Sequence, residues 1–429
     1  MRALLSFLLL TSLSVSAQNL DDRVTSELPD LLDRYKTLHA MPELSLNEAR
    51  TSAYLASRLR ELGYEVTEKF GRYEDPSTVS YGVVAVLRNG DGPIVLFRAD
   101  MDALPVTEQT GLPYASRNEG VMHACGHDVH MTTLLGAAKL LADLKPQWRG
   151  TVMFIGQPAE EVVKGAEGML KAGLYEKFGR PDYAIAFHDW ALLEAGRIGH
   201  RSGFFLSAAD SIDITIRGVG GHGANPQATK DPVVLAAETV LALQTIVSRE
   251  RSPFDPVVIT VGRIDGGTKR NIIPDDVRLQ LTVRTFRPEV RERVLESLQR
   301  IPAGLAMAAG VPADRAPLYQ HLAGESVAAT YNDPALTQRL AAAMSGELGE
   351  ANVVEIDAAM VSEDFGLFGL DRAIPTSLLA LGAGDPAALK AGTQPGLHSS
   401  SFAPADPALV LRTGVRGAVS AMLELLGKP

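Results

Sequence analysis

The stretch His123-Ala124-Cys125-Gly126-His127-Asp128 holds the only cysteine of the chain and two of its nine histidines. A thiol and an imidazole two positions apart can reach the same small volume, and both bind zinc-like or manganese-like ions. Gly126 permits backbone angles that a residue with a Cβ atom resists, and Asp128 can accept a hydrogen bond from a ring N–H. The stretch therefore predicts part of a metal site. The alternative is a buried cysteine beside two surface histidines.

Buried strands and helices alternate on both sides of this stretch. Apolar, β-branched runs predict strands over residues 83–87, 94–98, 151–155 and 183–187. Helical spacing predicts helices over residues 30–38, 46–62, 130–144 and 165–175. Strands alternating with helices are typical of an α/β fold, in which a mostly parallel sheet is covered by helices on both faces.

The pattern changes near Ser207. Strands are predicted over 211–216, 257–264, 277–286 and, weakly, 317–322, with helices over 231–249 and 288–308. This βαββαβ order favours one antiparallel sheet backed by two helices. Helix and strand patterns resume after Tyr331, where Asn332-Asp333-Pro334 predicts a helix start. We therefore predict a discontinuous catalytic domain, residues 18–205 and 326–429, with an inserted α+β domain over residues 206–325.

The first 17 residues read as a signal peptide. Arg2 is followed by an apolar run and by Val15-Ser16-Ala17, a small-residue cleavage site, so a periplasmic or secreted protein beginning near Gln18 is expected. The run is too short to span a membrane. One cysteine cannot form an internal disulfide, but a bound metal would keep its thiol occupied. The net charge of −10 argues against a nucleic-acid partner.

Further candidate ligands lie at or just beyond predicted strand ends or in loops. They are Glu160-Glu161, His188 and His398, and Asp100 and Asp102 also follow a strand end. Each taken alone is more often a hydrogen-bonded histidine, a turn cap or a solvated turn. Paired carboxylates placed after an apolar strand can instead divide their work. One ligates a metal, and its neighbour takes a proton from metal-bound water.

Long motifs spread over the chain resemble the metal-dependent aminoacylase–carboxypeptidase family, in its cysteine-containing amidohydrolase branch. That branch includes hippurate hydrolases and hydrolases of indoleacetyl–amino-acid conjugates. The most specific match is Phe97-Arg98-Ala99-Asp100-Met101-Asp102-Ala103-Leu104-Pro105. The others, in the order of the family, are residues 39–43, 123–130, 157–161, 220–226, 271–274, 362–365 and 397–399.

The resemblance implies two divalent ions, which are manganese, zinc or cobalt, and a role for each matching residue. The implied metal ligands are Cys125, His127, Glu161, His188 and His398. Glu160 is the implied general base and later acid. Asp100, Asp102 and Glu363 are implied to support the ligands. The inserted domain would be a lid and dimerisation module, so a homodimer or higher homo-oligomer is expected.

Three further residues have implied roles toward the substrate. His222 would meet the substrate carbonyl, in its own active site or in that of a partner chain, unless its glycine-rich turn is merely structural. Asn271 and Arg284 would grip the substrate carboxylate. Asp189-Trp190 departs from the family pattern, so one wall of the pocket should differ.

The remaining histidines are not expected to bind metal. His200 and His321 are interpreted as structural. His123 and His130 flank the central stretch without an implied ligand role.

The predicted function is metal-dependent hydrolysis of the amide bond of N-acyl amino acids by an activated water. A second hypothesis uses the same machinery as a carboxypeptidase or dipeptidase on short peptides. A third, from another class, is a catalytically inactive metal- or ligand-binding protein. Loss of Glu160 or of a ligand would favour the third hypothesis, and all of these residues are present.

Overall fold

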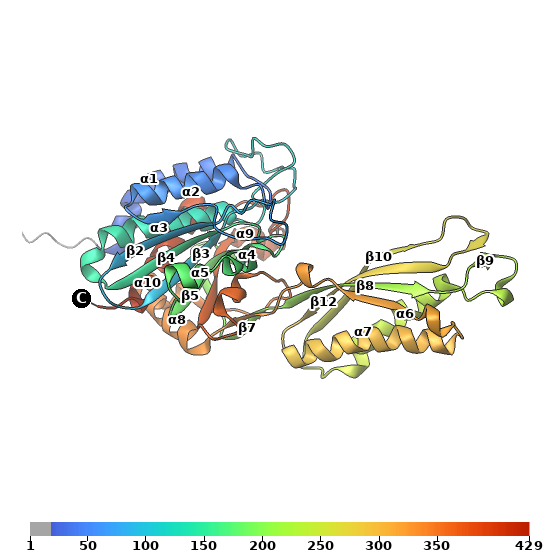
Figure 1. Ribbon diagram of the computed structural model, residues 1–429. Helices are drawn as coiled ribbons and strands as arrows, with labels where there is room; N and C mark the ends of the chain where they lie inside the picture. Colours follow the sequence, from blue (N-terminus) through green and yellow to red (C-terminus); the bar gives the residue numbers. More distant parts are fainter. Residues whose placement is uncertain (1–18, 429) are drawn as a thin grey trace, which may run out of the picture.

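Two lobes make up the protein in this computed structural model, which describes residues 19–428 (Figure 1). The large lobe is built on an eight-stranded sheet and the small lobe on a four-stranded sheet. The predicted signal peptide lies outside the described residues.

The sheet of the large lobe has parallel pairing at its centre. Strand β3 (Ile94–Asp100) lies between β4 (Gly150–Gln157) and β5 (Tyr183–Glu194) and is parallel to both, and β16 (Thr376–Gly384) is parallel to β5. The outer strands are β1 (Glu65–Thr67) and β2 (Val83–Asn89) on one side, and β6 (Ile198–His200) and β15 (Val353–Glu355) on the other. The mostly parallel α/β sheet predicted from the sequence is confirmed.

Both faces of this sheet are covered by helices. Successive side chains of a strand point to opposite faces, so each strand contributes to a buried cluster on either side. On β3, Val95 and Phe97 belong to one buried cluster and Leu96 to the other. The first cluster packs under α1 (Leu20–His39), α2 (Ala49–Glu61), α3 (His127–Asp143), α8 (Pro334–Leu348) and α10 (Pro407–Leu425). The second packs under α4 (Gly165–Lys171) and α5 (Leu174–Phe178). Helix α9 (Pro386–Ala391) follows β16.

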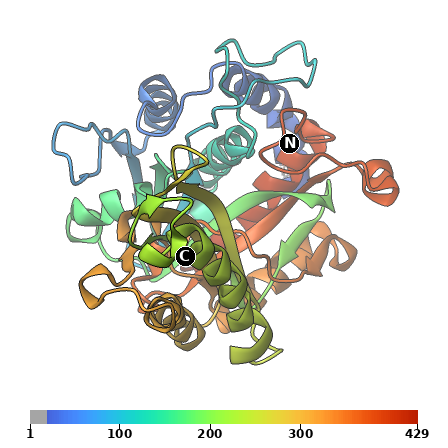
Figure 2. The same ribbon diagram turned by 90° about the vertical axis from the view of Figure 1, so that its right-hand side faces the viewer.

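The small lobe has the predicted βαββαβ order. Its elements are β8 (Ala208–Arg217), α6 (Pro232–Thr245), β10 (Val257–Gly266), β12 (Asp276–Thr285), α7 (Pro288–Ala308) and β13 (Leu318–His321). The strands form an antiparallel sheet in the order β10-β12-β8-β13, and both helices lie on one face of it (Figures 1 and 2). Two short strands, β9 (Gly221–His222) and β11 (Ile272–Ile273), pair at the end of the lobe far from the large lobe.

The chain passes between the lobes twice. Strand β7 (Gly203–Leu206) leads into the small lobe, β14 (Thr330–Asn332) leads out of it, and the two pair antiparallel. The connection is therefore a narrow two-stranded ribbon.

Several predicted boundaries in the large lobe were wrong. Helix α1 begins at Leu20 and not at residue 30, because the Asn19 side chain accepts the Asp22 N–H at 2.7 Å and caps the helix. The predicted helix 165–175 is split into α4 and α5 at Gly173, which has a left-handed φ of 82°. Strand β5 continues through His188 to Glu194, because β16 pairs with it along that length.

Candidate active site

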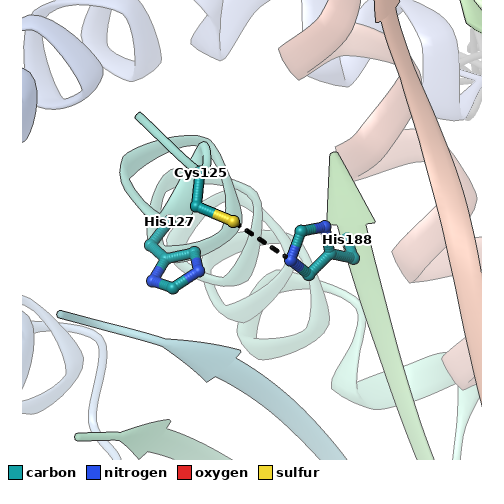
Figure 3. A group of neighbouring side chains, drawn as sticks. All are labelled: Cys125, His127 and His188. Atoms are coloured by element: carbon teal, nitrogen blue, oxygen red, sulfur yellow. Dashed lines mark hydrogen bonds between the residues drawn. The ribbon is translucent and has the colours of Figure 1, made fainter. Parts of the chain in front are cut away.

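The five predicted metal ligands converge at one place in the large lobe. The side-chain donor atoms of Cys125, His127 and His188 all lie within 4.8 Å of one another (Figure 3). Those of Cys125, Glu161 and His398 do the same. Cys125 is the member common to both groups, and its Sγ lies 3.6 Å from His188 Nε2 and 3.3 Å from His398 Nε2.

The start of α3 presents Cys125 and His127 to this place. Gly126 has φ 85° and ψ 15°, a left-handed conformation that brings the chain from the loop into the helix. A Cβ atom at this position would lie 2.5 Å from Asp189 Oδ2, so both the conformation and the space require glycine. The helix begins at His127, three residues before the predicted start, and this candidate ligand therefore lies on its first turn.

Backbone carbonyls orient two of the imidazoles. His127 Nδ1 lies 2.7 Å from the Asp102 carbonyl oxygen, and His188 Nδ1 lies 2.9 Å from the Asp189 carbonyl oxygen. Each ring therefore donates from Nδ1 and keeps a lone pair on Nε2. The Nε2 atom of His127 is buried and has no hydrogen-bond partner within the described chain, and the same holds for Glu161 Oε1. Unpaired buried acceptors that face one another fit a cation.

The environments of His130 and His123 differ from those of His127 and His188. The ring of His130 is 2.5 Å from Asp100 Oδ1 through Nδ1, and its Nε2 accepts the Asp189 N–H at 2.7 Å. Both nitrogens are thus occupied, which leaves no lone pair for a metal. His123 is buried, and that burial lowers its pKa to about 4.

The glutamate pair sits on a tight turn after β4. Asp102 accepts the Glu160 N–H at 3.1 Å and the Glu161 N–H at 3.0 Å. The carboxylates of Glu160 and Glu161 lie 3.9 Å and 3.8 Å from His127 Nε2. Burial and then the charge of Glu161 raise the pKa of Glu160 well above its usual range. A carboxylate with a raised pKa is suited to accept and return a proton near neutral pH.

A buried arginine lies beside the ligands. Arg98 Nη1 donates to Asp100 Oδ2 at 2.5 Å and to Glu363 Oε2 at 3.2 Å, and none of the three side chains is more than 3% exposed. Burial alone would raise the pKa of Asp100, but Arg98 and His127 outweigh it and hold the pKa well below its usual value. Asp100 is therefore charged, and it places negative charge 3.6 Å from His127 Nε2.

The residues predicted to meet the substrate do not gather in one chain. His222 is exposed on β9 and pairs with Ile272, next to Asn271, at the far end of the small lobe (Figure 1). Arg284 lies near the other end of β12, where its Nη1 donates to Ser362 Oγ at 2.9 Å. Eight residues of extended strand between positions 276 and 284 span about 27 Å. Arg284 and Asn271 of the same chain therefore do not grip one carboxylate in this arrangement.

The structure also places His321, His200 and Trp190, which the sequence analysis singled out. His321 Nε2 lies 2.8 Å from Asp210 Oδ1 in the small lobe, and His200 lies in β6. Trp190 stacks on Phe205 with ring centroids 5.4 Å apart, and so belongs to the second core cluster of the large lobe.

Sequence reasoning gave no role to His39. Its Nδ1 lies 2.6 Å from Asp128 Oδ2, and its Nε2 lies 3.1 Å from Glu108 Oε1. Burial by itself lowers the pKa of His39, but hydrogen bonds to the two carboxylates outweigh it and raise the pKa to about 10. This imidazolium ties α1 to the first turn of α3, where the ligands begin. The motif at residues 39–43 marks His39 in the sequence, but the motif does not show that the imidazole binds Asp128 and Glu108.

Residues 96–409 match the model of peptidase family M20/M25/M40. The chain belongs to this family, and it is a hydrolase of amide bonds. It is 38% identical to an N-acetyldiaminopimelate deacetylase of Limosilactobacillus fermentum over 83% of the chain and 89% of that protein. It is 40% identical to an N-acyl-L-amino acid amidohydrolase of Geobacillus stearothermophilus over 66% and 76% of the two chains.

A solved structure is also similar. The crystal structure of the Bacillus subtilis YXEP protein, a dinuclear metal-binding peptidase of the M20 family, matches with a TM-score of 0.75 and 28% identity. The match covers 94% of this chain and all of the other. Together with the grouped donors described above, it supports divalent metal ions in this site.

We expect His39→Gln to destabilise the protein in a pH-dependent way. The folded pKa of His39 is raised from about 6.5 to about 10, so its stabilisation is complete below about pH 6.5 and is lost as the pH rises through 10. The variant should lose about 3–5 kcal/mol near pH 6, the usual cost of breaking a buried ion pair. Urea unfolding of both proteins at several pH values measures this. A constant difference across this range would contradict the assignment, and His321→Gln serves as a control on the small lobe.

Proposed function

We propose that the protein hydrolyses the amide bond of N-acyl amino acids, using two divalent ions drawn from manganese, zinc and cobalt. The observation that carries this proposal is the pair of donor groups that share Cys125. Relatives named deacetylase and amidohydrolase support the substrate class.

The donor groups suggest how the ligands divide. His127 and His188 would hold one ion together with Cys125, and Glu161 and His398 would hold the other with the same thiolate. Burial raises the pKa of the Cys125 thiol in the protein alone. A bound cation reverses this effect and keeps a coordinating thiol deprotonated.

The reaction is argued from the side chains around this pocket. When bound, the metal ions polarise the amide carbonyl and lower the pKa of a water molecule. Glu160 takes a proton from that water and returns it to the leaving nitrogen. Asp102 holds the backbone of Glu160 and Glu161, so the base and the neighbouring ligand keep their separate directions.

We further propose that a second copy of the chain completes the active site. The helical segment Pro232–Glu250 is rich in apolar residues, yet only 33% of its most apolar 18-residue window is buried. Val234 and Leu241 on α6 are 55% and 73% exposed. The strand β10 is an edge of its sheet within the described chain. Exposed apolar helices and open strand edges are typical of contacts between subunits. Length and composition alone would also suit a membrane span.

The position of His222 is the functional argument for a dimer. It stands far from the metal ligands of its own chain (Figure 1). A lobe that projects this far can deliver His222 and Asn271 to the pocket of a second copy of the chain. In that copy, the copy's own Arg284 donates to its Ser362. There His222 would donate a hydrogen bond to the developing oxyanion, an effect worth on the order of 3 kcal/mol in comparable sites.

Export to the periplasm or the medium is proposed from the first 17 residues alone. N-terminal sequencing of the protein purified from its native cells would locate the mature start, and a start at Met1 would exclude cleavage.

The activity should depend on metal and favour acyl amino acids. Panels of N-acyl amino acids and of dipeptides are assayed before and after dialysis against a chelator. We expect faster hydrolysis of the acyl amino acids, loss of activity in the chelated protein, and recovery on adding manganese, zinc or cobalt. Faster hydrolysis of dipeptides would favour the peptidase hypothesis. Binding of metal without hydrolysis of either panel would favour an inactive binding protein.

Glu160→Gln and Glu161→Gln should fail in different ways. The first keeps the size of the side chain and loses the base, so kcat should fall by about two to four orders of magnitude while metal content stays at two ions. The second should lose metal. Metal analysis beside the rates decides between them. Loss of metal from Glu160→Gln, with both ions kept by Glu161→Gln, would exchange the two roles.

Mixing two inactive variants should restore activity if His222 acts across a dimer. His222→Ala and Glu160→Gln homodimers each lack one group at both sites. After subunit exchange a mixed dimer contains one intact site, so an equal mixture should reach about a quarter of the wild-type rate. Size-exclusion chromatography with light scattering checks the dimer. A mixture as inactive as its parents, with subunit exchange demonstrated by a tag, would contradict a role of His222 across the dimer. Full activity of His222→Ala by itself would place His222 outside the reaction.

A further inference from the structure

Two strained backbone positions meet at one buried carboxylate, that of Glu48. Its Oε1 accepts the Leu46 N–H at 2.9 Å and the Ala159 N–H at 2.8 Å, and the residue is fully buried. Leu46 has φ 67° and Ala159 has φ 53°. Both are left-handed residues with a Cβ atom, which is uncommon and persists only where surrounding contacts enforce it.

Ala159 lies immediately before the glutamate pair. Three consecutive backbone N–H groups, those of residues 159, 160 and 161, are therefore all bound by carboxylates. Glu48 binds the first, and Asp102 binds the second and third. The Ser45 hydroxyl in turn donates to Asp102 Oδ2 at 2.6 Å. The short segment 45–48 therefore supplies one of the two carboxylates and hydrogen-bonds to the other.

This arrangement sets the direction in which the two glutamate side chains leave the chain. Successive residues of a regular strand would point to opposite faces. The left-handed turn at Ala159 follows the end of β4 at Gln157 and lets Glu160 and Glu161 both approach His127 Nε2, at 3.9 Å and 3.8 Å. A rotation at Ala159 would move both carboxylates together.

We propose that Glu48 is a positioning residue for the reaction: its Oε1 atom holds the Ala159 turn and thereby aims Glu160 and Glu161. The proposal rests on the functions proposed above for those two glutamates. It assigns Glu48 no contact with substrate or metal.

Hydrogen-bond acceptance is the property that this role requires. Burial, and then the charge of Asp102, raise the pKa of Glu48 to about 7. The side chain can therefore carry a proton at neutral pH, and Oε1 can accept the two N–H groups in either form when the proton is on Oε2. Oε2 is buried and has no hydrogen-bond partner within residues 19–428. Glutamine reproduces the accepting oxygen without the charge, whereas leucine removes the acceptor at a similar volume.

The test compares Glu48→Gln, Glu48→Leu and a matched control, Glu43→Leu. Glu43 lies two residues before the segment 45–48 and accepts the N–H groups of Arg50 and Thr51 at the start of α2. Its side chain thus supports local structure, and within residues 19–428 its hydrogen bonds go to Arg50 and Thr51 and not to the turn at 159–161. For each protein, kcat and KM, urea stability and the affinity for cobalt(II) alone are measured, the last by absorption of the thiolate-bound ion.

Glu48→Leu should lower kcat by about 10- to 100-fold, or weaken cobalt binding by a similar factor, with KM unchanged. Glu48→Gln should stay near the wild type, and Glu43→Leu should lose stability without this loss of kcat. Equal losses in Glu48→Leu and Glu43→Leu, or a Glu48→Gln variant as impaired as Glu48→Leu, would overturn the proposal. Failure of the wild type to hydrolyse any substrate would instead overturn the proposed function, and cobalt binding would still test the role of Glu48.

Discussion

The large lobe depends on the charge of one fully buried guanidinium, that of Arg98. A buried charge without partners is very costly, so the chain must bring carboxylates to it. Asp100 comes from the same strand, but Glu363 is 265 residues away and lies beyond the small lobe. This requirement fixes the returning chain against β3. It also gathers negative charge beside the candidate ligand His127, where a dication would need it.

The need of buried polar groups for partners also distinguishes the histidines of the site. Three buried imidazoles lie close together, with ring centroids 4.7 to 5.9 Å apart. His127 and His188 each use one nitrogen on a backbone carbonyl and present the other to the pocket, whereas His130 uses both. The difference between a ligand and a supporting histidine is therefore not a matter of position in the pocket. Among these three rings it is set by whether Nε2 already accepts a backbone N–H, as that of His130 does.

Much of the fold could be predicted because local patterns encode it, and the candidate ligands named from the family motifs have donor atoms that lie close together in the structure. Strand periodicity identified the core of β3 and β4, and the order of elements gave the small lobe. What failed was non-local: the length of β5 depends on β16, which pairs with it from nearly 200 residues away. The roles of His39 and Glu48 were missed for the same reason, because their partners are distant along the chain. The separation of Asn271 from Arg284 follows from the length of β12, which family motifs do not report.

The strand β16 has a consequence for the synthesis of the protein. It lies inside the large sheet, between β5 and β6, although it follows the whole small lobe in the chain. A ribosome releases the strands of the small lobe, residues 208–321, as one continuous piece with its own core. That piece can fold while the large sheet still lacks an interior strand. Until residue 384 has emerged, the exposed edges of β5 and β6 are open to wrong pairing, so the nascent chain is most vulnerable to aggregation late in translation.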